Sequence, residues 1–299
     1  AEISIKKVRV APFSGIHLSG FLMKDQLKDT LFYAENVRAG VDMFSLRKKH
    51  LYLGRVRFES PVIHLEQHEE EMNFSFLMDA LVTNRKDSAE WKYSIRNLVI
   101  REGQVSFSHS ILENPNAIKN RLFFTGLELD VRRMSEVNDS LVFEVADFAV
   151  REEIGLAIEA FRTTGFVYKD RIVIRDLLFR TAASSFDFAE IELPLVREDT
   201  SGYEIPFRGL AREIVIAPDE VRMLFSGFPH LEDDLRLSGL IFGSLENLKG
   251  RQITGSFGQD TRIVTSFDIN GLSNFNEAFL YLDIESFQTS VTDLELLFE

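Results

Sequence analysis

The stretch LELDVRRMSEVNDSLVFEVA, residues 127–146, contains two runs of alternating side chains around an Asn138–Asp139 turn signal. Apolar residues occupy every second position of residues 127–131, and the alternation resumes over residues 141–145. A period of two places one set of side chains on a dry face of a β-strand and the other set on a wet face. The stretch therefore predicts two antiparallel strands joined by a tight turn.

The same pattern recurs along the chain, separated by short turn signals such as Glu102–Gly103, Lys169–Asp170 and Asn270–Gly271. A parallel α/β fold would need a helix between most strands, and these intervals leave no room for one. We therefore expect consecutive strands to pair antiparallel. Further half-buried strands are expected over residues 55–59, 93–100, 105–109, 156–161, 166–168, 172–179, 186–193, 262–269 and 279–284.

Three places predict a helix. Asn73 is a candidate cap for residues 74–81, which carry apolar side chains on one face. Pro218–Glu220 begins a second helix, and Ser290 or Thr292 with Asp293 begins a third. The last two share an acidic start after a strand and a Leu-Phe ending, so they indicate either a degenerate internal repeat or a chance similarity in a Leu-rich chain.

Composition narrows the class of protein. With 45% hydrophobic residues among 299, the chain can bury a substantial core, which excludes a disordered chain. The net charge of -13 argues against nucleic acid and anionic lipid headgroups as partners, because both attract Lys and Arg. The 27 Phe against 6 Tyr and 1 Trp favour a broad apolar surface over a polar pocket.

Candidate catalytic and metal-binding motifs are weak. His64 and His68 lie four apart, but the surrounding residues predict a strand, on which they would not converge on a metal. The neighbouring acids Glu152–Glu153 and Asp233–Asp234 would face opposite sides of a strand and could not flank one glycosidic bond. The chain has no cysteine. We expect no catalytic residue, no metal and no cofactor, and a hydrolase acting on envelope glycans is the least favoured hypothesis.

The order of the N-terminal motifs resembles the periplasmic region of the TamB and AsmA-like family. Residues 171–181, 237–254 and 269–272 resemble later strand and strand-Gly-strand units of the same family. Each motif is ordinary strand and turn chemistry, so the resemblance depends on their order. The N-terminal motifs are Gly15–Phe21, Thr30–Ala39, Phe44–Leu46, Ser60–Leu65, Asn73–Phe74 and the Ile100, Gly103, Val105, Phe107 pattern.

The resemblance implies a mainly β fold, an elongated antiparallel sheet curled into a β-taco-like groove with a few short helices. It implies an AsmA-like N-terminal β module with one helix over residues 1–110, and a repeating antiparallel segment over 111–299 that continues the same sheet. It also implies a periplasmic location, with the intact protein anchored in the inner membrane by an N-terminal segment. Ala1 is not an initiator Met and residues 3–10 already predict a strand, so we expect that segment to precede this chain.

The function implied is non-catalytic: phospholipid transport between the inner and outer membranes through a hydrophobic groove, or assembly of outer-membrane proteins, or both. The implied partners are acyl chains or nascent β-barrel proteins, with a barrel-insertase partner docking through regions outside this chain, and no nucleic acid. Burial of acyl chains is favourable by about 0.8 kcal/mol per methylene and needs no ionisable residue. The expected contact residues are Phe143, Val145, Leu156, Ile158, Ile172, Ile174, Phe186, Phe188, Phe267 and Ile269.

Two alternatives remain open from the residues. Periodicity alone favours a closed sandwich, in which the same apolar side chains pack on one another, and only the resemblance favours an open groove. The alternative function is that of a rigid β interaction module, which binds protein clients by pairing an edge strand with theirs.

Overall fold

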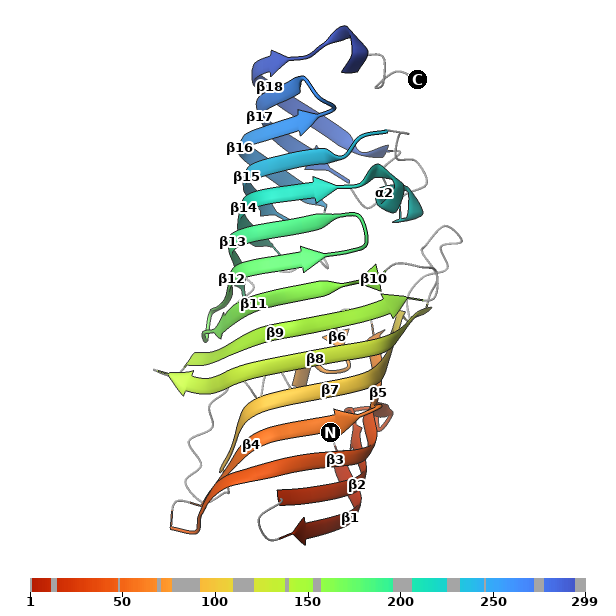
Figure 1. Cartoon of the computed structure of the whole chain (residues 1–299), viewed down its shortest axis with the longest axis vertical. Coiled ribbons are helices and arrows are strands. Elements are labelled where there is room, and N and C mark those ends of the chain that lie inside the picture. Colours follow the sequence, from red (N-terminus) through yellow and green to blue (C-terminus); the bar gives the residue numbers. More distant parts are fainter. Residues whose placement is uncertain are drawn as a thin grey trace. The chain divides into compact units, whose positions relative to one another are not determined.

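The computed structural model describes residues 2–11, 15–47, 49–68, 71–76, 92–109, 121–137, 140–152, 157–195, 206–224, 232–244, 246–271 and 277–293. Within these residues the chain is mainly β, with antiparallel pairing dominant and only short helical segments, which confirms the predicted fold class (Figure 1). The chain divides into two compact units, residues 1–169 and 170–299. The boundary expected at residues 110 and 111 lies outside the described residues.

Unit 1 contains eleven of the described strands, β1 to β11. β1, β2, β3 and β4 pair in sequence order, β7, β8 and β9 do the same, and β9 also pairs with β10 and β11. The bounds are β1 Glu2–Ala11, β2 Gly15–Lys24, β3 Thr30–Ser45, β4 His50–Glu59, β5 Val62–His68, β6 Glu71–Met72, β7 Lys92–His109, β8 Arg121–Val137, β9 Ser140–Glu152, β10 Ala157–Ile158 and β11 Ala160–Val167.

The expectation of consecutive antiparallel pairing is wrong at one place in unit 1. β4 and β5 both run parallel to β7, β4 along its first half and β5 along its second. The two short strands behave as one strand interrupted at Ser60–Pro61, where Ser60 N–H donates to Arg101 O and Gln104 N–H donates to Pro61 O, each at 2.8 Å. Residues 69–91 between β5 and β7 are long enough for the crossover that parallel pairing requires.

Unit 2 is a consecutive antiparallel ladder from β12 to β18, in which each strand pairs with the next (Figure 1). One short helix, α2, follows β14. The bounds are β12 Arg171–Arg180, β13 Ser185–Pro194, β14 Phe207–Ile216, α2 Pro218–Leu224, β15 Leu235–Gly243, β16 Asn247–Phe257, β17 Thr261–Asn270 and β18 Phe279–Gln288.

The predicted helix starts are present where the structure describes them. The helix at Pro218 is confirmed as α2, with Asp219 and Glu220 in its first turn. Residues 291–293 are helical, and Ser290 Oγ accepts a hydrogen bond from Asp293 N–H at 3.2 Å, so Ser290 is the cap. Residues 75–76 are helical after Asn73, while residues 77–81 lie outside the described part of the chain.

A buried cluster in unit 1 gathers the small and β-branched residues Ala34, Val37, Ala39 and Val56. Phe21, Phe32 and Phe58 pack against it from three different strands, with ring centroids 5.0 to 6.2 Å apart in edge-to-face geometry. These strands are therefore held together by their side chains as well as by their backbone ladder.

Candidate functional site

The strand registers define one continuous apolar face in unit 2. Residues opposite each other in an antiparallel pair project from the same face of the sheet. On this face, two complete rows of partners cross all seven strands, and neither row contains an ionisable side chain. The 174 row is Ile174, Ile191, Gly209, Ile241, Gly250, Phe267 and Leu282, and the 179 row is Phe179, Phe186, Ile214, Leu237, Gly255, Ile263 and Phe287.

Unit 1 has apolar rows of the same kind. Partners continue across the parallel β4–β7 pair, so its change of direction does not interrupt the face. The 8 row is Val8, Leu18, Val37, Phe58, Ile100, Leu129 and Phe148, and the 10 row is Val10, Ile16, Ala39, Val56, Leu98, Val131, Val145 and Thr163.

The apolar face ranges from buried to half-buried in the interior of the ladder and is exposed at its last strand. Ile253 on β16 is 1% exposed, whereas Leu282 and Phe287 on β18 are 44% and 52% exposed. β1 in unit 1 shows the same exposure, because Val8 is 55% and Val10 is 73% exposed. The edge strands β1 and β18 therefore leave apolar side chains exposed.

Each unit bends along a crease, defined as the strand positions where two successive residues point away from the apolar face. In unit 2 the crease passes through residues 175–176, 189–190, 212–213, 251–252 and 285–286, with register shifts at most of these positions. Asp176 and Gln252 have left-handed backbone there, each with φ of 51°. Bulges of this kind bend a strand and increase its twist, so the crease curves the sheet.

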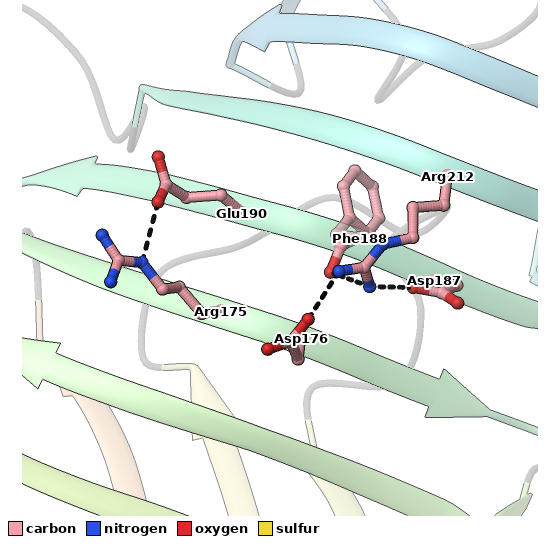
Figure 2. Close-up of polar contacts among 6 residues, drawn as sticks. All are labelled: Arg175, Asp176, Asp187, Phe188, Glu190 and Arg212. Atoms are coloured by element: carbon pink, nitrogen blue, oxygen red, sulfur yellow. Dashed lines mark hydrogen bonds and ion pairs between the residues drawn. The ribbon is translucent and has the colours of Figure 1, made fainter.

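The face opposite the apolar rows carries charge pairs that cross the strands (Figure 2). Arg212 on β14 donates to Asp187 Oδ1 on β13 at 2.9 Å and also bridges to Asp176 on β12. Arg175 Nε lies 2.9 Å from Glu190 Oε2 on the next strand. The bulge therefore aims Arg212 at carboxylates on two neighbouring strands.

Several glycines on the apolar faces lie beneath phenylalanine rings of neighbouring strands. A Cβ added to Gly250 would lie 2.3 Å from the Phe267 ring, and one added to Gly209 would lie 2.9 Å from the Phe188 ring. In unit 1, a Cβ on Gly165 would lie 2.3 Å from the Phe143 ring. Each ring thus occupies the space above a glycine, as in aromatic rescue of glycine in sheets.

The acid at the start of each unit 2 helix binds a hairpin turn of an earlier strand pair. Glu220 in α2 accepts a hydrogen bond from Ala183 N–H at 3.0 Å and another from the Thr181 hydroxyl, both in the turn between β12 and β13. Burial raises the pKa of Glu220, but the hydrogen bonds from Ser184, Thr181 and the turn backbone outweigh it and hold the pKa below its usual value.

Asp293 repeats this arrangement at the turn between β16 and β17. Its Oδ2 accepts from Thr261 N–H at 2.7 Å, Thr261 Oγ1 at 2.8 Å and Asp260 N–H at 2.9 Å. The Thr261 hydroxyl and the backbone donors lower the pKa of Asp293. The same chemistry at two helix starts supports the internal-repeat interpretation of these segments.

Nine of the ten expected contact residues lie on the apolar faces. Ile172, Ile174, Phe186, Phe188, Phe267 and Ile269 share the face of unit 2, and Phe143, Val145 and Ile158 share that of unit 1. Phe188 and Val145 are buried, while the others are half-buried. Leu156 lies outside the described residues.

Within the described ranges, no group of three or more His, Cys, Asp or Glu could hold a metal ion. His64 Nδ1 instead lies 2.7 Å from Ser106 Oγ on the neighbouring strand, while the side chain of His68 falls outside the described part. No helix among the described residues is both long and apolar enough to span a membrane.

Three features were not predicted from the sequence: the crease, the two acids that bind turns, and the exposed edge strands. A signal for the crease exists: Arg175–Asp176, Arg212–Glu213 and Arg251–Gln252 are pairs of adjacent polar residues inside otherwise alternating strands. Comparison with known proteins adds no assignment, because no protein-family model matches the chain and no curated protein matches it.

Proposed function

We propose that the apolar faces bind acyl chains, and that the chain is a non-catalytic periplasmic segment of a TamB-like or AsmA-like protein that moves phospholipid between the two membranes. The observation that carries this proposal is the pair of unbroken apolar rows across unit 2, from Ile174 to Leu282 and from Phe179 to Phe287. An acyl chain needs contiguous apolar surface and no hydrogen-bonding group, and these rows provide both.

The distribution of charge supports the same proposal. Arg212 pairs with both Asp187 and Asp176 on the opposite face, so these charged groups are kept away from the apolar rows. The crease bends the sheet, which would wrap the apolar face around a guest and leave a lipid headgroup in water. Each methylene removed from water would contribute about 0.8 kcal/mol.

Native mass spectrometry of the purified chain, combined with protection of a fluorescent acyl probe from an aqueous quencher, tests the proposal. We expect co-purifying phospholipid and a protected probe. Leu282→Glu, on the apolar face of β18, should reduce protection, whereas Tyr281→Glu on the opposite face of the same strand should not. A stable, folded chain that carries no lipid and protects no probe would refute acyl-chain binding.

The alternative function is that of a rigid β interaction module that recognises strands of nascent outer-membrane proteins. A barrel-insertase partner would dock through regions outside this chain. The observation that favours it is the exposure of β18, whose every residue is exposed. An edge strand can add a client strand through its backbone. Backbone pairing would leave the apolar rows unused, so acyl-chain binding accounts for more of the structure.

A further inference from the structure

The hairpin tip, which we define as residues 41–47 and 49–51 at the end of β3 and the start of β4, exposes four large apolar side chains. Val41 is 39%, Met43 51%, Phe44 55% and Leu46 71% exposed. A single exposed apolar residue is ordinary on a protein surface, whereas a contiguous group marks a contact site. Elsewhere among the described residues, outside β1 and β18, such side chains are exposed one at a time, at Leu27, Leu210, Met223 and Val291.

The tip extends past the neighbouring strand of the sheet (Figure 1). β2 begins at Gly15, and Ile16 lies opposite Ala39, so residues 41–45 of β3 reach beyond β2. The turn is tight, because Lys49 N–H donates to Leu46 O at 3.2 Å and Lys49 has left-handed backbone with φ of 46°. The tip is therefore a structured projection of the sheet.

Apolar side chains lie on both faces of the tip. Val41 and Phe44 lie opposite Leu53 and Leu51, which are two residues apart on β4 and so share one face. Leu53 packs against the buried cluster of unit 1, so this is the apolar face. Met43 lies opposite the residue between those two leucines, on the other face. A flat protein surface would cover only one face, whereas a bilayer that the tip enters surrounds both.

The charge of the tip is opposite to that of the chain as a whole. Arg47 and Lys49 are exposed at the turn, while the chain has a net charge of -13. The acid among the described residues of the tip, Asp42, pairs with Arg96 on β7 at 2.6 Å, so it does not offset the basic residues of the turn. The average surface repels anionic lipid, and a local basic group such as this one attracts it.

We propose that the hairpin tip binds the surface of an anionic phospholipid bilayer. Met43, Phe44 and Leu46 enter the boundary between headgroups and acyl chains, and Arg47 and Lys49 lie against the lipid phosphates. The apolar side chains stabilise binding by leaving water, and the basic ones by their attraction to anionic lipid. This site goes beyond acyl-chain binding by the sheet and does not rest on it.

Flotation of the 299-residue chain with lipid vesicles is the first test. One set of vesicles contains phosphatidylglycerol and phosphatidylcholine, and the other contains phosphatidylcholine alone. We expect binding to the anionic vesicles that weakens as salt is added, because exposed charges are screened, and much weaker binding to the neutral ones. Absence of binding to the anionic vesicles would overturn the proposal in favour of a protein partner at the tip. Equal binding to both sets would overturn the role of the basic residues.

Apolar substitutions test whether the tip is the part that binds. The Phe44→Ser, Leu46→Ser variant should bind anionic vesicles at least about tenfold more weakly than the wild type. Leu210→Ser is the control, because Leu210 is a leucine on β14 that is 50% exposed outside the tip. Circular dichroism checks that each variant is folded. If the control weakens binding as much as the tip variant, the tip is not the site.

Charge reversal tests the basic residues and separates this site from the sheet. Arg47→Glu with Lys49→Glu should weaken vesicle binding at least about tenfold, whereas Arg162→Glu with Arg180→Glu, which changes the net charge equally at exposed positions, should weaken it far less. The tip variant should still protect an acyl probe supplied without vesicles. Vesicle binding by a wild-type chain that protects no such probe would refute acyl-chain binding alone. Equal loss in both variants would contradict the proposal.

A fluorophore at the tip gives the most local readout, since the chain has no native cysteine. β3 is 16 residues long, so the turns at its two ends lie about 50 Å apart. Leu46→Cys labels the tip, and Leu27→Cys labels the other turn, where residues 24–29 have two Lys and two Asp. Anionic vesicles should shift the emission of an environment-sensitive dye to the blue at position 46 and leave it unchanged at position 27. A shift at position 27 alone, or at neither position, would overturn insertion of the tip.

Discussion

The ring of Phe267 on β17 lies directly over Gly250 on β16, so a Cβ added to Gly250 would lie only 2.3 Å from Cε1 of that ring. Ile253 Cγ1 would lie 2.7 Å from the same Cβ. Gly250 therefore has no room for a side chain, and the two residues are neighbours in the 174 row.

Gly250→Ala should destabilise the chain by about 1–3 kcal/mol, the usual cost of adding a methyl group to a filled core. Urea denaturation measures the change. Gly40→Ala is the control, because its nearest neighbour outside the adjacent residues, Arg55, would lie 3.8 Å from the new Cβ. The Gly40 variant should be neutral or up to about 1 kcal/mol more stable. Equal stability of both variants would contradict the role of Phe267.

Gln252→Gly should leave the chain as stable as the wild type or stabilise it by about 1 kcal/mol, because Gln252 has φ of 51°, which glycine adopts without steric cost. Thr254→Gly in the same strand should be destabilising by about 0.5–1 kcal/mol, since that residue has no such backbone conformation. Thermal or urea unfolding of both variants measures these changes and tests the left-handed backbone of the crease at Gln252. A clear loss of stability in the Gln252 variant would contradict a bulge at this position.

Stability should fall in acid through Glu220 and Asp293. Both carboxyl groups have lowered pKa values in the folded chain, so each binds a proton less readily there than in the unfolded chain. Their contribution is fully present above the unfolded-state pKa of about 4 and is lost as the pH falls through the folded-state value. The urea midpoint should therefore decrease over this range.

The double variant Glu220→Gln, Asp293→Asn should weaken that pH dependence and lower the urea midpoint near neutral pH. Glu232→Gln with Asp233→Asn serves as the control, because both positions are exposed in the segment before β15. If the urea midpoint of the double variant falls in acid as steeply as that of the wild type, the helix-to-turn contacts do not cause the loss of stability in acid.

Mainly β structure was predictable from the sequence because the period-two alternation is strong in strands such as residues 127–131 and 141–145. The helix at Pro218 was predictable from its proline and acids. The parallel β4–β7 pairing was not, because it depends on a crossover between strands that are far apart in sequence.

The candidate face was only partly predictable. Alternation identified Ile172 and Ile174 as sharing one face, but Leu177 and Phe179 join that face only because Arg175–Asp176 inserts an extra outward residue. Strict alternation would have moved them to the opposite side. The register with β13 places Leu177 opposite Phe188 and Phe179 opposite Phe186. This contact between strands fixes the face on which Leu177 and Phe179 lie.

Binding of an acyl chain to the apolar face is tested most directly by bimane fluorophores attached at single cysteines on one strand. Ile263→Cys places the label in the 179 row, and Arg262→Cys places it on the opposite face of β17. Phospholipid carrying a nitroxide on its acyl chain should quench the label at position 263 strongly and the label at position 262 weakly. Equal quenching at both positions, or none at either, would contradict acyl-chain binding by this face.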